Sequence, residues 1–466
     1  MKIFNWLSRL ASQQVWTVYQ PDEIEIGFDD LIGLDNAKEE LKDIVQYVKN
    51  PSKFQEFGVT PYLHYLINGP TGCGKTSLAY AIAKEADIPV IMVECLEFVS
   101  TKKNSFKLLN DLFKTASSHK ISVLLLKNFD KLFSIDDAYR TFFLNNLIHL
   151  MRENTNVIVI STLSVQINIL GGEYLFEEGG FNREINIDFP DMKIREEMYE
   201  KFCEGMPIAD DVSFERLAID SYSMTAKDIK RIIKNAMLLS VRNNSPDITR
   251  EAFDEALSNE LLGQKKKRMT NKERRSTAYH EAGHVVAGYF TDPEYKLSKV
   301  EVVHRSESLG VTMQVTDEDK LSYFKSDWEN KIISFFGGMA AERVVFGSNS
   351  SGVSQDLAMA TLYARMMISI FGMDNEFGPM SVAGAHNSGS EDDTVSPNCS
   401  EYILNQLDML VQKMLKDLYE RCEAVVSSHR RELDALAEAL FERELVYGNE
   451  IEEIFKSLKD NESENL

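Results

Sequence analysis

Two histidines and a glutamate are the residues of this chain whose types and spacing most directly suggest chemistry. They occur in the run His280-Glu281-Ala282-Gly283-His284. On an α-helix, residues four apart lie one above the other on the same face, so both imidazoles can reach one metal ion. Glu281 would project beside them, where its carboxylate can take a proton from a metal-bound water. The pattern is typical of a helix that binds zinc and hydrolyses peptide bonds.

The same pattern has a plainer interpretation, in which two histidines on a buried helix are satisfied by hydrogen bonds alone. Glu281 argues against this interpretation, because an acidic side chain on that face would need a buried partner of its own. The flanking residues favour a helix. Ser276 or Thr277 can cap its start, and the apolar residues 285–287 continue a buried face.

A second group of residues suggests phosphate binding. It consists of Gly69-Pro70-Thr71-Gly72-Cys73-Gly74-Lys75-Thr76 and is followed by Ser77. This run fits G-x-x-x-x-G-K-[ST], in which backbone N–H groups and the lysine contact phosphates and the last hydroxyl contacts Mg²⁺. A strand is predicted at Tyr62–Asn68 and a helix at Ser77–Ala86, so the positive end of the helix would face the anion. We therefore predict a nucleotide-binding loop rather than a glycine-rich turn.

Strands and helices alternate around this loop, which predicts an α/β domain with a parallel sheet over residues 21–190. The other strands are predicted at Pro89–Val93, Ile121–Leu126, Asn156–Ser161 and Ile185–Phe189, and further helices at Asp35–Lys49 and Phe106–Ser117.

The remainder of the chain is predicted to be mostly helical. Residues 191–262 form a small helical subdomain, 263–275 a basic linker, and 276–458 a domain in which Val300–Val315 can pair as strands. The loop Asn387–Ser400 is expected to be mobile, and the tail 459–466 to be disordered. Further helices are expected at Lys193–Phe202, Ser213–Ser221, Ala226–Arg242, Arg250–Leu261, Glu401–His429 and Arg430–Arg443.

Composition narrows the class of protein. The chain has 466 residues and a net charge of −22, which disfavours nucleic acid as a partner. Its five cysteines include no Cys-x-x-Cys pair, and no apolar run approaches the roughly 20 residues that span a bilayer. We therefore expect a cytoplasmic protein. Residues 1–20 are an arm whose apolar and basic start suits a peripheral membrane contact as well as docking on its own domain.

The order of these pieces resembles the FtsH-type AAA+ zinc metalloproteases, from about Phe28 to the mid-440s. The stretch 276–284 matches the catalytic helix of that family nearly residue for residue, and Phe28–Gly33 resembles the start of its ATPase domain, which places Ile32 and Gly33 beside the nucleotide. Leu309–Thr312 and Gly337–Glu342 match later peptidase segments. The resemblance implies a AAA+ domain with a helical lid, then a mostly helical zinc-peptidase domain, with Zn²⁺ and ATP as cofactors.

The resemblance also supplies a third zinc ligand, which spacing alone leaves open. The segment Ser351–Asp356 resembles the part of the family whose aspartate completes the metal site. The implied ligands are His280, His284 and Asp356, with a water in the fourth position and Glu281 as the general base. A catalytic zinc site needs such an open position.

The ATPase half departs from the family at several positions. Where the family has Asp-Glu after a buried strand, this chain has Lys127-Asn128, which can neither hold Mg²⁺ nor activate water, and Asp130 is a poor substitute. Leu163 replaces the polar γ-phosphate sensor. Gly180 replaces the first of two arginines that act in trans, and only Arg183 remains. The pore loop at 98–105 lacks its aromatic-glycine pair.

The leading hypothesis is a zinc endopeptidase that degrades unfolded proteins and binds ATP but hydrolyses it slowly or not at all, because water activator, metal ligand and charge stabiliser are lost together. Lys127 could neutralise phosphate charge in place of Mg²⁺, whose binding is doubtful. A nucleotide-binding scaffold or regulatory subunit, and a fully ATP-driven protease, are the alternatives. The resemblance implies a hexamer, formed with itself or with a related AAA protease.

Overall fold

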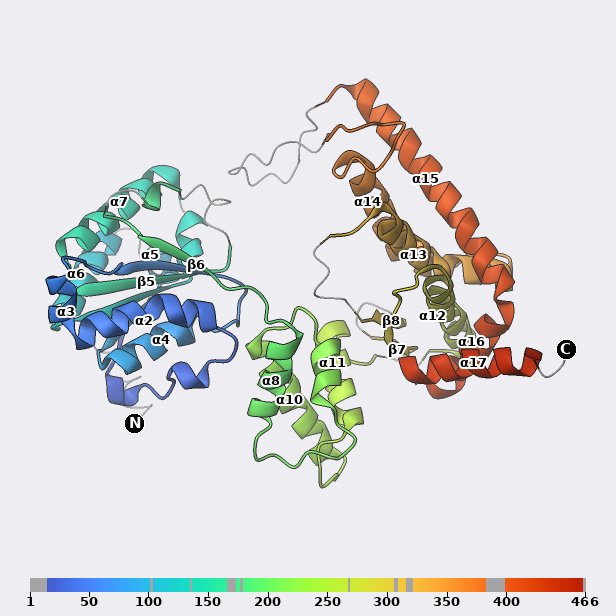
Figure 1. Ribbon diagram of the computed structural model, residues 1–466, viewed down its shortest axis with the longest axis horizontal. Coiled ribbons are helices and arrows are strands. Elements are labelled where there is room, and N and C mark those ends of the chain that lie inside the picture. Colours follow the sequence, from blue (N-terminus) through green and yellow to red (C-terminus); the bar gives the residue numbers. More distant parts are fainter. Residues whose placement is uncertain are drawn as a thin grey trace. The chain divides into compact units, whose positions relative to one another are not determined.

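The computed structural model (Figure 1) describes residues 15–463 apart from 101–103, 135, 166–172, 177–178, 267–268, 306–308, 316–321 and 383–398. The chain divides into two compact units. The first contains the residues up to Glu204 together with Ser223–Arg231, and the second contains Gly205–Tyr222 and most of the chain from Ile232 onward. Each unit has its own hydrophobic core.

A six-stranded sheet forms the centre of the first unit, with the strand order β1-β3-β4-β5-β2-β6. Strand β1 pairs antiparallel with β3 at one edge, and the other pairings are parallel. The central strands are buried on both faces, as is usual for parallel sheets. The strands are β1 (Thr17–Tyr19), β2 (His64–Asn68), β3 (Val90–Glu94), β4 (Ser122–Lys127), β5 (Val157–Leu163) and β6 (Arg183–Asn186).

Helices cover both faces of this sheet (Figure 1). Because successive side chains of a strand point to opposite faces, Val123 and Leu125 of β4 join one core while Leu124 and Leu126 join the other. The first core lies under α2 (Asp35–Lys49) and α4 (Lys75–Ala86), and the second lies under α5 (Leu96–Ser100), α6 (Ser105–Ser117) and α7 (Asp137–Glu153). The layers therefore hold the ends of the strands, where the nucleotide loop begins, in fixed positions.

The strands predicted from buried apolar runs are present, with ends that differ by a few residues. Two elements differ from the sequence analysis. One is Thr17–Tyr19, which was expected to belong to an N-terminal arm and forms the edge strand β1. The other is α7, and the shorter helices α3 (Pro51–Glu56) and α5 were not anticipated either. A three-residue edge strand is too short to show a period, since backbone pairing rather than side-chain alternation defines it.

The second unit is mainly helical and also contains the three-stranded sheet β8-β7-β9. Strands β7 (Leu297–Glu301) and β8 (Val311–Gln314) are the pair expected within 300–315, whereas β9 (Leu445–Tyr447) was not predicted. The helices that build the core of this unit are α12 (Asn271–Thr291), α13 (Lys325–Phe346), α14 (Ser354–Ser369), α15 (Glu401–Ser428), α16 (Arg430–Arg443) and α17 (Gly448–Ser463).

The helices α12 and α13 cross at a point where their backbones touch. A Cβ atom at Gly283 of α12 would lie 2.3 Å from the carbonyl oxygen of Gly337 on α13, which no side chain can accommodate. Glycine at these two positions lets the helices approach closely, so that the histidines of α12 lie against residues of α13.

The start of α12 differs from the prediction. We expected Ser276 or Thr277 to cap the helix, but it begins at Asn271, within the predicted basic linker. Thr270 is the N-cap, and its side chain accepts from the backbone N–H of Glu273. The Glu273 carboxylate in turn accepts from the backbone N–H of Thr270, which completes a capping box. The earlier cap therefore adds almost two turns to the helix.

The predicted helical subdomain contains α8 (Met192–Phe202), α9 (Phe214–Asp220), α10 (Ala226–Arg242) and α11 (Arg250–Leu262). The boundary between the two units passes through it, because α8 belongs to the first unit while α9 and α11 belong to the second. We propose that the predicted domain boundaries at 190, 262 and 275 describe successive parts of the chain rather than separate bodies.

Buried charges join α11 to the β7 strand within the second unit. The ammonium of Lys299, which is 1% exposed, lies 3.6 Å from Asp254 Oδ1 and donates to Ser258 Oγ at 3.2 Å. The guanidinium of Arg305 bonds Glu255 Oε2 at 3.2 Å and Glu301 Oε1 at 2.6 Å. Because buried charges are stable only when paired, these contacts fix α11 on the sheet.

The C-terminal helix α17 extends to Ser463, so that 459–463, expected to be disordered, are helical. The mobile loop predicted at 387–400 lies almost entirely outside the described residues. None of the helices in the described ranges combines the length and apolar content needed to cross a membrane.

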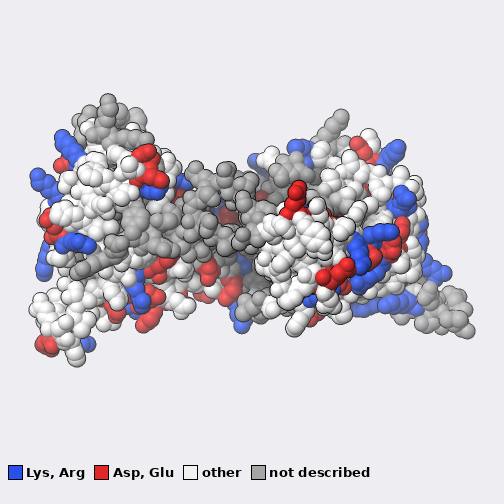
Figure 2. Space-filling view, turned by 90° about the horizontal axis from the view of Figure 1, so that it is seen from above, with Lys and Arg blue, Asp and Glu red and all other residues white. Residues whose placement is uncertain are grey.

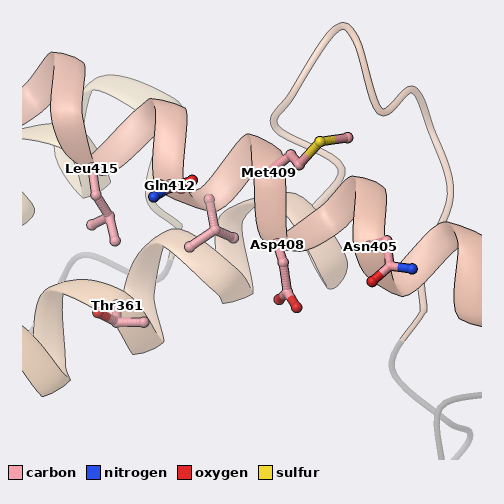
Figure 3. Close-up of a pocket in the computed structure, with 7 residues that line it drawn as sticks. Thr361, Asn405, Asp408, Met409, Gln412 and Leu415 are labelled. Carbon is pink, nitrogen blue, oxygen red and sulfur yellow. The ribbon is translucent and has the colours of Figure 1, made fainter.

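Charged side chains of both signs lie beside one another on the face shown in Figure 2. A groove between α14 and α15 (Figure 3) is lined by a mixture of polar and apolar side chains. The predicted zinc-site residues do not line this groove. The lining residues are Thr361, Asn405, Asp408, Met409, Val411, Gln412 and Leu415.

Candidate zinc centre and nucleotide site

Three side chains from two helices converge at one point of the second unit. His280 Nε2 lies 3.1 Å from His284 Nε2 and 3.2 Å from Asp356 Oδ2, and His284 Nε2 lies 3.5 Å from the same oxygen. The histidines occupy successive turns of α12, and Asp356 is in the first turn of α14. The structure thus brings together residues 76 positions apart in the sequence.

The separations of these donor atoms fit a tetrahedral zinc ion. With Zn–N and Zn–O distances of about 2.0–2.1 Å, tetrahedral angles place neighbouring donor atoms about 3.3 Å apart. The three observed separations, 3.1, 3.2 and 3.5 Å, surround this value. The donor set of two imidazoles and one carboxylate is also one that a catalytic zinc site uses, with the fourth position left for water.

The second nitrogen of each imidazole is held by α13. His280 Nδ1 donates to Glu342 Oε1 at 2.9 Å, and His284 Nδ1 donates to the carbonyl oxygen of Ser334 at 2.7 Å. Such partners fix the tautomer, so that both Nε2 lone pairs point to the same place. A Cβ atom at Gly338 would lie 2.5 Å from the His280 ring, which explains why glycine stands there.

Glu342 also acts on the third donor. Its carboxylate accepts from Ser350 N at 2.5 Å and from Ser350 Oγ at 2.9 Å. Ser350 immediately precedes the short helix η6 (Ser351–Val353), which runs directly into α14 and Asp356. One buried carboxylate therefore orients both His280 and the segment that carries Asp356.

The electrostatics of the cluster match a site built for a cation. Burial opposes a charged imidazole at His280, but hydrogen bonds to Asp356 and Glu342 and the charge of Glu281 outweigh it and raise the pKa of His280 to about 10. Burial also opposes ionisation of Asp356 and Glu342, yet the adjoining imidazoles lower the pKa of Asp356 well below its usual range, and His280 and Ser350 lower that of Glu342.

Glu281 directly follows His280, one of the predicted ligands, and is only 5% exposed. Its Oε2 accepts a hydrogen bond from Thr312 Oγ1 at 2.8 Å. Thr312 belongs to β8, so an edge strand of the small sheet holds the carboxylate in place. Thr312, which is partly buried, is thus the hydrogen-bond partner of this acidic residue.

The phosphate-loop pattern occupies the turn between β2 and α4 in the first unit. Three of its glycines, Gly69, Gly72 and Gly74, have positive φ values of 153°, 102° and 97°. Lys75 donates to the carbonyl oxygens of Gly69 and Pro70 at 2.5 and 2.8 Å. Lys75, Thr76 and Ser77 form the first turn of α4, so the positive end of the helix faces the loop.

The other predicted nucleotide-binding residues lie in the loop itself or shortly before α2. Thr71 Oγ1 lies 3.3 Å from Ser164 Oγ, which follows β5, and Cys73 is buried beneath the loop. Ile32 and Gly33 precede α2, and Gly33 has a φ of 70°.

The residues that depart from the family pattern lie at the carboxyl end of the sheet. Lys127 forms an ion pair with Glu94 Oε1, and Asn128 Nδ2 donates to Glu94 Oε2 at 2.8 Å. Asp130 is 9% exposed and lies 3.2 Å from Lys131. An ammonium and an amide thus occupy the end of β4, where an ATPase of this fold carries carboxylates, while Thr76 keeps the hydroxyl that such a loop offers to Mg²⁺.

Among the described residues, the other departures and the remaining arginine contact the protein itself. Leu163 is fully buried in the apolar core, and Gly180 contributes its carbonyl oxygen, which lies 3.0 Å from His64 Nδ1. Arg183 lies over the ring of Tyr62, with 5.4 Å between the guanidinium carbon and the ring centroid. Residues 101–103 of the expected pore loop lie outside the described residues.

A phosphate loop on a parallel sheet, followed by helices that place two histidines, an aspartate and a glutamate together, defines an ATP-binding zinc peptidase. Residues 65–186 match the ATPase family associated with various cellular activities (AAA), and residues 267–454 match peptidase family M41. The chain belongs to the FtsH family of ATP-dependent zinc metalloproteases, as the relatives below show.

The chain is similar to several curated proteins over nearly its whole length. ATP-dependent zinc metalloprotease FtsH 4 of Sphaerobacter thermophilus is 33% identical over 453 residues, which are 94% of this chain and 68% of the relative. FtsH of Aquifex aeolicus is 33% identical over 94% of this chain and 72% of its own length. A solved structure from work on katanin self-assembly is 23% identical, with a TM-score of 0.46, and covers 54% of this chain and 89% of its own.

These comparisons confirm the predicted fold class, the family, the zinc endopeptidase activity and the cofactors Zn²⁺ and ATP. The sequence analysis missed the supporting contacts. Glu342 and Thr312 both lie within segments matched to the family, but nothing in their spacing indicates which histidine or carboxylate they touch. Ser334 acts through its backbone, which leaves no signal in the sequence.

Proposed function

We propose that His280, His284 and Asp356 bind the zinc ion of this endopeptidase and that Glu281 is its general base. The observation that carries the proposal is the convergence of the three donor atoms, with each imidazole held from behind by α13. Zinc held there lowers the pKa of a bound water and polarises the peptide carbonyl. Glu281 takes a proton from the attacking water and transfers it to the leaving amine.

The edge strand β8 supports a proposal for how the substrate lies. Strand β8 pairs with β7 on one side and has no partner strand on the other within the described residues. An extended peptide can add there as a further strand, which brings its carbonyl toward Glu281 because Thr312 of β8 contacts that carboxylate. Unfolded proteins and short peptides are therefore the favoured substrates, since a folded domain presents no such extended segment.

We propose further that this chain binds ATP but hydrolyses it slowly or not at all. Support comes from Lys127 and Asn128, which leave no water-activating carboxylate at the end of β4, and from Leu163, which has no polar group for the γ-phosphate. Each of the lost groups contributes orders of magnitude to hydrolysis in related ATPases. Steady-state turnover near about 1 s⁻¹ or faster would overturn this part of the proposal.

The test combines zinc content with degradation of an unfolded protein, with and without ATP and with a chelator. The Glu281→Gln variant should keep zinc and lose cleavage, because glutamine cannot accept the proton. The Glu438→Gln variant makes the same chemical change at an exposed position of α16 and serves as the matched control. Intact cleavage by Glu281→Gln would refute the assignment of the base.

We also propose that the chain assembles into a ring, with itself or with a related AAA protease. The match of residues 65–186 to the AAA family supports assembly. A mass measured in solution with ATP bound, six times that of the 53.0 kDa chain, would support a homohexamer. A monomer that enters a larger particle only when an active relative is added would support the mixed ring.

A further inference from the structure

An ion pair occupies the end of β4, where the metal-binding carboxylate of an ATPase is expected. Glu94 ends β3 and is the parallel-strand partner of Lys127, which ends β4. The Lys127 ammonium contacts Glu94 Oε1, and Asn128 Nδ2 donates to Glu94 Oε2 at 2.8 Å. About a third of each side chain of the pair is exposed, 34% for Lys127 and 36% for Glu94, so the pair faces the solvent at the carboxyl ends of β3 and β4.

The residue after Lys127 and the phosphate loop both form hydrogen bonds at the end of β5. The backbone N–H of Asn128 donates to Thr162 Oγ1 of β5 at 3.1 Å. Two residues further, Ser164 Oγ lies 3.3 Å from Thr71 Oγ1 in the loop. The pair and the phosphate loop thus lie at the same carboxyl end of the sheet, since β4 and β2 are the two parallel neighbours of β5. In ATPases of this fold the end of this strand holds the Mg²⁺ that bridges the β- and γ-phosphates.

Lysines pair with the carboxylates near this place, although Asp130 Oδ1 has no hydrogen-bond partner among the described residues. Glu94 is neutralised by Lys127. Asp130 is buried in the turn after β4 and lies 3.2 Å from Lys131. A divalent cation placed between β4 and the phosphates would meet the Lys127 ammonium at short range, and like charges repel most strongly in such a partly dehydrated site.

We propose that this chain binds ATP without a divalent cation, with the Lys127 ammonium supplying the positive charge at the γ-phosphate and Glu94 holding that ammonium until the nucleotide arrives. The inference rests on the proposed nucleotide site with slow hydrolysis. Binding then exchanges one ion pair for another, because Lys127 leaves Glu94 and contacts the phosphates. Because Glu94 competes with ATP for Lys127, it weakens nucleotide binding. It also favours ATP over ADP, since the additional charge of the triphosphate best displaces a carboxylate.

The test is equilibrium binding of ATP and ADP, measured by displacement of a fluorescent ATP analogue in excess EDTA and in excess Mg²⁺. The wild-type affinity for ATP in EDTA should be within about threefold of that in Mg²⁺, which is about 0.65 kcal/mol. Lys127→Met, which keeps the aliphatic stem, should weaken ATP binding in EDTA about tenfold or more and ADP binding less, whereas Lys127→Arg should retain most of the affinity.

Glu94→Gln separates the proposed role from a merely structural ion pair. If Glu94 competes with the nucleotide, removal of its charge should tighten ATP binding in EDTA about three- to tenfold, even if the fold loses a little stability. A structural pair predicts lower thermal stability with unchanged affinity. Lys114→Ala, which removes an exposed cation of α6, is the matched control and should change neither affinity.

Three results would overturn the inference: ATP binding at least tenfold tighter in Mg²⁺ than in EDTA, an unchanged affinity in Lys127→Met, or no binding of nucleotide under either condition. The ATPase rate is measured separately on the same samples. Binding that needs Mg²⁺ without turnover would refute the inference and leave slow hydrolysis standing. Metal-independent binding accompanied by rapid turnover once Mg²⁺ is added would refute slow hydrolysis and leave the inference standing.

Discussion

Glu342 provides the sharpest mutational test of how the zinc site is built. Its side chain is 3% exposed and accepts from His280 Nδ1 at 2.9 Å, from Ser350 N at 2.5 Å and from Ser350 Oγ at 2.9 Å. Glu342→Gln keeps the size and an acceptor oxygen but removes the charge. We therefore expect both the His280 ring and the segment that carries Asp356 to lose part of their orientation.

The magnitude follows from the two positions affected. A hydrogen bond to a charged acceptor contributes about 1 kcal/mol more than one to a neutral acceptor, so weakening the bonds to His280 and to Ser350 should cost about 1.4–2.7 kcal/mol of zinc binding. This corresponds to a dissociation constant about 10- to 100-fold higher, the usual range for partners of metal ligands. Glu342→Ala, which leaves Ser350 and His280 without an acceptor, should weaken zinc binding further.

The assay is competition for zinc with a chromophoric chelator at fixed pH. Glu329→Gln, in the same helix α13, is the control, because Glu329 pairs with Arg421 at 3.1 Å on the surface and does not contact the ligands. Cleavage at saturating zinc should recover toward the wild-type rate in Glu342→Gln. A zinc dissociation constant within twofold of wild type in both Glu342 variants would refute the reasoning.

Three other variants test separate parts of the structure. Thr312→Val removes the donor to the general base, so we expect cleavage of an unfolded protein to slow about tenfold with zinc content unchanged, and an unaltered rate would contradict that role. Lys299→Ala leaves Asp254 with Arg250, 3.6 Å from its Oδ2, as the remaining cation, so it should lower the free energy of unfolding by about 1–3 kcal/mol, measured by urea denaturation. Burial opposes ionisation of Glu255, but Lys265 and Arg305 together lower its pKa. The stabilising contribution of ionised Glu255 is therefore present above the pKa that Glu255 has in the unfolded chain, and it is lost as the pH falls through its lower pKa in the folded protein. The difference in unfolding free energy between wild type and Glu255→Gln should thus shrink as the pH falls from about 6 to 3. A difference that is constant over this range would contradict the pairing.

Local patterns predicted the parts of each site that lie on one element. His280, Glu281 and His284 share one helix, and Gly69–Thr76 form one turn, so helix geometry and loop chemistry were sufficient to propose them as site residues. Their roles stay predictions. Buried apolar runs likewise predicted the central strands, because strands covered on both faces show no polar alternation.

Contacts between distant elements were not predictable in this way. Asp356 came from a resemblance rather than from spacing, and Glu342 and Thr312 reach the site through helix packing and sheet pairing that only the fold defines. The Lys127 position was recognised as a departure, but its partner Glu94 lies on the neighbouring strand and is fixed by the parallel register.

The most direct test of the zinc assignment is an anomalous difference map recorded at the zinc absorption edge from crystals of the zinc-loaded protein. The proposal predicts a single strong peak in the second unit, about 2.0–2.2 Å from His280 Nε2, His284 Nε2 and an Asp356 carboxylate oxygen, with water as the remaining ligand. A peak elsewhere, or a fourth protein side chain in the position reserved for water, would contradict it.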